Sequence, residues 1–114
     1  MLETERLAIV EAAESDIGWI VAQENDEENR RCIWVGTYEE HLAEIADPGH
    51  RLLVIRRKDG VETVGYALAR LDFKSERFEL RRIVIAQKGR GYGRESMEAL
   101  MKYAFETLKF NRFW

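Results

Sequence analysis

The chain has 114 residues, of which 46% are hydrophobic and 34% charged, and its formal net charge is −3. This composition excludes intrinsic disorder and the length excludes two full domains, so we expect one domain over residues 1–114. No stretch approaches the roughly 18 uncharged apolar residues of a membrane span, and the single cysteine, Cys32, excludes an intrachain disulfide and a thiolate metal cluster. We expect a soluble cytoplasmic protein without a metal or a membrane contact.

The charges are distributed unevenly along the chain. Residues 1–50 carry 13 acids against 3 bases, whereas residues 77–94 carry 6 bases against Glu79 alone. The basic segment favours a compact polyanion such as a phosphorylated cofactor over a nucleic acid, which usually requires a broader basic face. On charge alone, a solvated charged loop is an equal alternative.

The first third of the chain predicts one strand and two helices. Residues 7–10 predict a strand, and Ser15 is the predicted N-cap of a helix that fades in the acidic stretch 24–28. That stretch either attracts a cationic amine or is a solvated helix end. Thr37 and Glu40 have the spacing of a capping box, and the helix that they start ends at residues 47–49. Its expected inner face is Leu42, Ile45 and Ala46.

Three further strands are predicted after these helices. Residues 52–55 and 64–71 are apolar runs, and Asp59-Gly60 between them is typical of a hairpin with a type I′ turn. A strand over residues 77–85 follows the turn near Lys74-Ser75. In this strand the apolar residues have even numbers before Arg81-Arg82 and odd numbers after it. This change of parity predicts a β-bulge there.

Residues 94–109 predict an amphipathic helix, because the spacing between successive apolar residues alternates between three residues and one residue. Its core stripe is Met97, Leu100, Met101, Ala104, Phe105 and Leu108. Residues 112–114 predict the beginning of another strand.

A loop with three alternate glycines, Gly89, Gly91 and Gly93, joins that bulged strand to the helix. Glycines let the backbone turn its N–H groups toward a ligand at the positive end of a helix dipole, where phosphate binds readily. The spacing is neither that of a dinucleotide fingerprint nor that of a P-loop. Taken alone, the loop is either a phosphate site or a plain tight turn.

The order of these elements resembles the GNAT-type N-acetyltransferases over nearly the whole chain. The family's pyrophosphate signature is Gln or Arg, two free positions, Gly, one free position, and Gly or Ala. It falls on residues 88–93, with Lys88 in place of the Gln or Arg. Residues 34–41 and 64–66 are similar to the branch that contains ribosomal-protein alanine acetyltransferases.

The resemblance implies an α/β fold with a mixed, largely antiparallel sheet flanked by helices, in which the bulged strand 77–85 leads into a pyrophosphate-binding loop and the helix 94–109. It also implies that C-terminal strands and a helix of the family fold are missing here. Acetyl-CoA would be the co-substrate, with its pantetheine arm on Ile83, Val84 and Ile85. The pyrophosphate would lie on Lys88, Gly89, Arg90, Gly91, Tyr92, Gly93 and Arg94.

The implied reaction is direct attack of a neutral primary amine on the thioester. An alkylamine is almost wholly protonated at neutral pH, so a general base is needed. Glu79 is the candidate catalytic residue; the alternative is an ion pair of Glu79 with Arg77 or Arg81. The family geometry places the oxyanion on a backbone N–H near Val84. Cys32 and His41 have no partners in the sequence pattern, which disfavours a covalent Cys–His mechanism.

The sequence leaves open whether the acceptor is a protein N-terminus, a polyamine, an amino acid or an aminoglycoside. We expect a homo-oligomer formed through strand edges or C-terminal exchange, with poor or no activity in a truncated chain. Two other classes of protein compete with the enzyme: a non-catalytic acyl-CoA-binding or assembly module, and an unrelated nucleotide-phosphate-binding domain.

Overall fold

The computed structural model describes residues 2–25, 37–60, 62–86, 89–110 and 112–113. Six strands form one sheet in the order β1-β2-β3-β4-β5-β6. Neighbours from β1 to β5 are antiparallel, and β6 is parallel to β5. The strands are β1 (Leu2–Glu3), β2 (Leu7–Glu11), β3 (His50–Arg57), β4 (Thr63–Asp72), β5 (Arg77–Ile85) and β6 (Arg112–Phe113).

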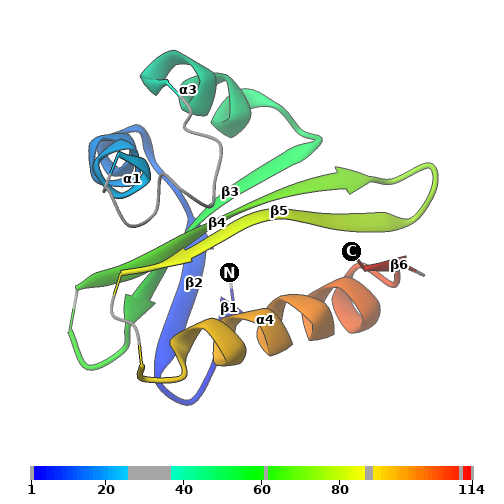
Figure 1. Cartoon of the computed structure of the whole chain (residues 1–114). Helices are drawn as coiled ribbons and strands as arrows, with labels where there is room; N and C mark the ends of the chain where they lie inside the picture. The colour runs from blue at the N-terminus through cyan, green and yellow to red at the C-terminus, as the bar shows by residue number, and fades with distance from the viewer. Residues whose placement is uncertain (1, 26–36, 61, 87–88, 111, 114) are drawn as a thin grey trace.

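Helices cover both faces of this sheet (Figure 1). On one face lie α1 (Ile17–Glu24) and α3 (Tyr38–Ala46). On the other face lies α4 (Tyr92–Lys102), which continues into a π-helical turn, η2 (Tyr103–Thr107). The mixed α/β architecture with a largely antiparallel sheet is therefore confirmed.

Each face of the sheet has its own apolar core. The core on the α4 face includes Ile9, Ile55, Phe78 and Leu100. The core on the α1 and α3 face includes Ile20, Val54, Leu68 and Val84. No helix of the described residues is long and apolar enough to span a membrane.

The start of α1 differs from the prediction. Ser15 lies inside a 3-10 turn, η1 (Glu14–Asp16), and is not the N-cap of α1. The carboxylate of Asp16 instead accepts a hydrogen bond of 2.8 Å from the N–H of Ala13. The side chain of Asp16, which is longer than that of Ser15, thus stabilises the turn that leads into the helix.

Helix α3 begins with the predicted capping box. The hydroxyl of Thr37 accepts from the N–H of Glu40 at 3.1 Å, and the Glu40 carboxylate accepts from the N–H of Thr37 at 3.3 Å. Of its predicted inner face, Ile45 packs on the core. The prediction is wrong for Leu42, which is 38% exposed, and for the exposed Ala46, whereas His41 is fully buried. The helix therefore turns a polar residue, His41, toward the interior.

The hairpin of β3 and β4 is confirmed, but its type I′ turn is not. Neither Asp59 nor Gly60 has a positive φ, which a type I′ turn requires at both central residues. The N–H of Arg57 donates to the carbonyl of Glu62 at 3.0 Å, so a longer loop closes the hairpin.

The bulged strand is confirmed. Leu68 pairs with Arg82 and Ala69 with Leu80, which leaves Arg81 as the extra residue. As the parity change predicted, Leu80 packs on the α4 core before the bulge and Ile83 packs on it afterwards.

Helix α4 begins at Tyr92, two residues before the predicted start. Its buried residues are Tyr92, Ser96, Leu100 and, in η2, Ala104. This i+4 row faces the sheet, so Met101 and Phe105 of the predicted stripe are 39% and 43% exposed. Residues 108 and 109, which the prediction included, lie beyond the last helical turn.

Candidate active site

The second half of β5 has an open edge. Strand β6 pairs with β5 at Arg77 and Phe78, and within the described residues no strand lies beside β5 beyond that point. The N–H of Ala86 donates to the carbonyl of Val64 at 2.7 Å. Because hydrogen-bonded pairs alternate along an antiparallel ladder, the peptide groups of Ile83 and Ile85 face the open edge.

The same alternation turns the peptide N–H of Val84 into the ladder with β4, opposite Tyr66. The oxyanion donor expected near Val84 is therefore not the N–H of Val84 itself. The nearest N–H that faces the open edge after the bulge belongs to Ile83.

Strands β4 and β5 approach closely beside this edge. A Cβ added at Gly65 would lie 2.5 Å from the carbonyl oxygen of Val84 and 2.8 Å from Cδ1 of Ile85. Only glycine allows that approach without displacing β5.

The glycine loop leads directly from β5 into α4. Gly89 and Gly91 have φ values of 81° and 77°, in the left-handed region that favours glycine, and Gly91 is the N-cap of α4. Arg90 and Arg94 are exposed. Lys88, the first position of the predicted signature, lies outside the described residues.

The first turn of α4 is fixed by Glu95. Its carboxylate accepts hydrogen bonds from the Thr4 hydroxyl, from the backbone N–H of Arg6 at 3.1 Å and from Nε of Arg6 at 2.7 Å. Desolvation opposes ionisation of this carboxyl, but the hydrogen bonds from Thr4 and Arg6 outweigh it and lower its pKa. The guanidinium of Arg6 also lies 4.7 Å from the ring centroid of Tyr92. Tyr92, a predicted cofactor-binding residue, is therefore buried beneath Arg6.

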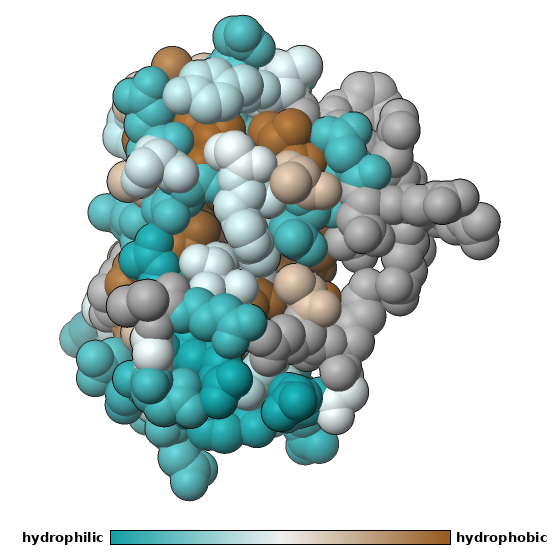
Figure 2. Space-filling view, turned by 90° about the vertical axis from the view of Figure 1, so that its left-hand side faces the viewer, coloured by the Kyte–Doolittle hydropathy of each residue, from teal (hydrophilic) through white to brown (hydrophobic). Residues whose placement is uncertain are grey.

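A pocket of about 430 Å³ lies beside this turn, lined by Arg6, Arg57, Lys58 and Tyr92 among others. Figure 2 shows that the lower part of this end of the molecule is mostly hydrophilic. Carboxylates partner its cations, with Arg6 2.7 Å from Glu95 and Arg57 2.7 Å from Asp59. The pocket is thus a charged but largely neutralised surface.

Glu79 lies on β5 just before the bulge. Its neighbours Phe78 and Leu80 pack on the α4 core, so the side chain of Glu79 points to the face that carries α1 and α3. It is half-buried, and it is opposite Arg70 in the register. Arg81 lines a pocket of about 380 Å³ on this face.

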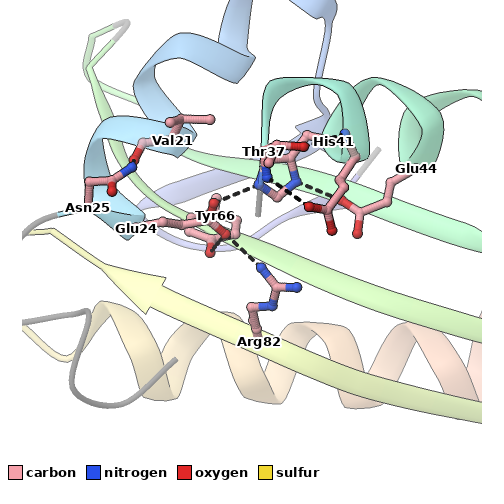
Figure 3. A network of polar contacts seen from close by, with 9 residues as sticks. Val21, Glu24, Asn25, Thr37, His41, Glu44, Tyr66 and Arg82 are labelled. Carbon is pink, nitrogen blue, oxygen red and sulfur yellow. Dashed lines mark hydrogen bonds and ion pairs between the residues drawn. The ribbon is translucent and has the colours of Figure 1, made fainter. Parts of the chain in front are cut away.

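A buried polar network on the same face was missed by the sequence analysis (Figure 3). The carboxylate of Glu24 contacts Nε2 of His41 at 2.6 Å and accepts from the Tyr66 hydroxyl at 2.5 Å and from Nη1 of Arg82 at 2.7 Å. The other ring nitrogen of His41 contacts Glu44 at 2.6 Å. Glu24, His41 and Tyr66 are fully buried.

The electrostatics of this network are those of paired charges. Burial opposes charging of His41, but the carboxylates of Glu24 and Glu44 outweigh it and raise its pKa to about 9. Burial likewise raises the pKa of Glu24, but the hydrogen bonds from His41 and Tyr66 and the charges of His41 and Arg82 leave it below the ordinary value. Burial and the Glu24 carboxylate raise the pKa of Tyr66, so its hydroxyl stays a donor.

Both readings of the acidic stretch are wrong for Glu24, which is neither solvated nor free to attract an amine. Residues 26–28 of that stretch and Cys32 lie outside the described residues. No sequence spacing links Glu24, His41 and Arg82, which come from α1, α3 and β5. The one available signal for this network was a polar residue, His41, within a helix that packs on the sheet. Among the described residues, no group of three or more His, Cys, Asp or Glu side chains is arranged to hold a metal ion.

A family model described as "Acetyltransferase (GNAT) domain" matches residues 6–114. Comparison with curated proteins finds no match. An acetyltransferase (GNAT family) from Bacillus anthracis is 21% identical, with a TM-score of 0.81 over 98% of this chain and 70% of that one. A mutant spermidine N-acetyltransferase from Vibrio cholerae is 18% identical, with a TM-score of 0.75 over 94% and 67%. A dodecameric structure of spermidine N-acetyltransferase from that organism, in an intermediate state, is 17% identical, with a TM-score of 0.74. The chain thus spans about two thirds of the length of the Vibrio cholerae chains.

Proposed function

The chain belongs to the acetyltransferase (GNAT) domain family, and from this premise we propose that it transfers the acetyl group of acetyl-CoA to a primary amine. The family match over residues 6–114 carries the proposal. The bulged strand with an open edge supports it, since this strand leads through two left-handed glycines into the N-terminus of α4.

Acetyl-CoA would bind along β5 and the loop that follows it. The pantetheine arm would hydrogen-bond to the open edge at the carbonyl of Ile83 and at Ile85 as an added strand does, with Val84 between them. The pyrophosphate would lie on the backbone N–H groups at the start of α4, from Gly89 to Arg94. Arg90 and Arg94 would supply exposed cations at this end, although Arg94 also pairs with Glu98 at 3.0 Å. Lys88 belongs to the proposed site on the sequence signature alone.

The chemistry requires a base, an oxyanion donor and a leaving group. The Glu79 carboxylate would take a proton from the ammonium group of the acceptor, directly or through water. The neutral nitrogen would then attack the thioester carbon, and the N–H of Ile83 would donate to the oxygen that becomes negative. As the C–S bond breaks, the nitrogen would lose a second proton to the departing sulfur, directly or through water, so that CoA leaves as the thiol and the acetylated amine remains.

Self-association is part of the proposal. Strand β1 ends the sheet on one side, and the second half of β5 is open within the described residues on the other. Open strand edges can pair with a second copy. Light scattering over a range of protein concentrations would measure this, and a monomer at every concentration would contradict it.

Ligand-dependent thermal unfolding tests the function. Acetyl-CoA at about a hundred times its Kd should stabilise the protein by about 2.7 kcal/mol, and ATP at the same concentration should not. Release of free thiol from acetyl-CoA should then be measured with spermidine, an amino acid, an aminoglycoside and a short peptide. Stabilisation by acetyl-CoA without thiol release on any amine would support the non-catalytic alternative. Stabilisation by ATP but not by acetyl-CoA would contradict the proposal that this chain has an acetyl-CoA site.

A further inference from the structure

We propose that Glu24 is a positioning residue that holds β5 in place beside the acetyl-CoA site, acting through Arg82. The inference rests on the proposed function, because it concerns the strand on which the pantetheine arm would lie. Arg82 follows the bulged Arg81 directly and precedes Ile83, whose peptide group faces the open edge.

The contacts of Glu24 join four elements at one carboxylate. Glu24 is the last residue of α1. Its Oε2 atom accepts from Tyr66 on β4 and from Arg82 on β5, and its Oε1 atom contacts His41 on α3. In Figure 3 the three partner side chains converge on this carboxylate from different directions.

Two of these partners belong to the segment next to the open edge. Tyr66 is paired with Val84, and Arg82 lies two residues before Val84 on the same strand. The carboxylate therefore holds β4 and β5 together across the site from the α1 face. A displacement of Arg82 would move the peptide group that joins it to Ile83, because the two share a peptide bond.

Stability alone gives no reason for such a network. Replacing a buried ion pair by well-packed apolar residues is often neutral or stabilising. The core around this network is otherwise apolar, with Leu52, Val54 and Leu68 nearby on the same face. Apolar contacts are non-directional, whereas hydrogen bonds to a carboxylate fix the direction of the donor. What Glu24 adds to this core is the direction in which Arg82 is held.

The chain offers a matched control in Glu44. Its carboxylate contacts Nδ1 of His41 at 2.6 Å on the opposite side of the ring, and Glu44 lies on α3, away from β5. Removing the charge of Glu44 therefore disturbs the same histidine without removing the acceptor of Arg82.

The experiment compares Glu24→Gln, Glu44→Gln and Tyr66→Phe with the unaltered chain. Hydrogen exchange of the Arg82 and Val84 amides, which bond to β4, is measured without ligand, and the Kd for acetyl-CoA is measured by calorimetry. We expect Glu24→Gln to speed exchange of both amides more than tenfold and to raise the Kd about tenfold or more. Glu44→Gln should leave both quantities within about twofold. Tyr66→Phe, which removes one donor and keeps the carboxylate, should fold and raise the Kd about twofold to fivefold.

Equal effects of Glu24→Gln and Glu44→Gln on exchange and affinity would overturn the proposal, since they would show a merely structural role. If Glu24→Gln does not fold, an unchanged exchange rate and Kd in Tyr66→Phe would overturn it. If the unaltered chain fails to bind acetyl-CoA, the proposed function fails, and the exchange of the two amides still decides whether Glu24 positions β5.

Discussion

The Nε2 atom of His41 lies 2.6 Å from Oε1 of Glu24, and neither side chain is exposed to solvent. This contact joins the end of α1 to α3, and Glu44 on the other side of the ring makes His41 a bridge between two carboxylates. A neutral imidazole has one N–H and can donate to only one of them, whereas the protonated ring donates to both. The geometry therefore requires a charged histidine in the interior.

Stability should accordingly fall at alkaline pH. The pKa of His41 is raised from 6.5 to about 9 in the folded chain, so its contribution is complete below about pH 6.5 and is lost as the pH rises to 9. A difference of that size corresponds to roughly 3 kcal/mol. The lowered pKa of Glu24 acts oppositely: its contribution is present above about pH 4.5 and is lost as the pH falls further. The free energy of unfolding, measured in urea, should be highest between about pH 5 and 6.5.

The variant His41→Gln provides the control for this pH dependence. It should be less stable than the parent at pH 6, and its free energy of unfolding should change much less between pH 6.5 and 9. An equally steep loss of stability in His41→Gln would assign the alkaline transition to another group.

Gly65→Ala should destabilise the fold and displace β5. The added Cβ would meet the Val84 carbonyl at 2.5 Å, a backbone atom that cannot move without the strand. A cost of about 1 to 3 kcal/mol is expected from such overpacking. Gly18→Ala is the matched control: its Cβ has no neighbour within 4 Å on α1, and it should stabilise by about 0.5 to 1 kcal/mol. Equal unfolding midpoints in urea for the two variants would contradict the close approach of β4 and β5.

Gly91→Val should abolish acetyl-CoA binding and leave the chain folded. Gly91 has a φ of 77°, which a β-branched residue resists, and it is the N-cap where the pyrophosphate would approach. Gly60→Val is the control, because Gly60 is in an exposed loop without positive φ and without neighbours within 4 Å. Calorimetry should show no binding for the first variant and the parent's Kd for the second. Parent-like affinity in Gly91→Val would move the pyrophosphate site elsewhere.

The sequence predicted those features of the fold that depend on local patterns. The bulge at Arg81 was visible as a change of parity, and the capping box at Thr37 was visible as a spacing of three residues. The type I′ turn at Asp59-Gly60 failed because the hairpin closes through Arg57 and Glu62, outside the two residues that the rule considers.

The buried network could not be predicted in the same way. Its carboxylate and its cations come from elements separated by 17 and 58 residues along the chain, and only the packing of α1 and α3 on the sheet brings them together. The interior position of His41 on α3 depends on that packing. Local helix periodicity therefore assigned the inner face to Leu42 instead.

Glu79→Gln should lower the rate of acetyl transfer mainly near neutral pH. An alkylamine acceptor is almost wholly protonated there, so removal of a base that takes its proton should cost about 10²-fold to 10⁴-fold. The loss should shrink toward pH 10, where the free amine no longer needs the base, provided that rates are compared over the range in which each variant stays folded.

Glu106→Gln is the control for this prediction. It changes a carboxylate that is 65% exposed on η2, and it should keep the pH–rate profile of the parent. Glu79 is half-buried on β5 just before the bulge, and its side chain lies on the face of α1 and α3. A pH–rate profile of Glu79→Gln parallel to that of the parent would remove this residue from the mechanism.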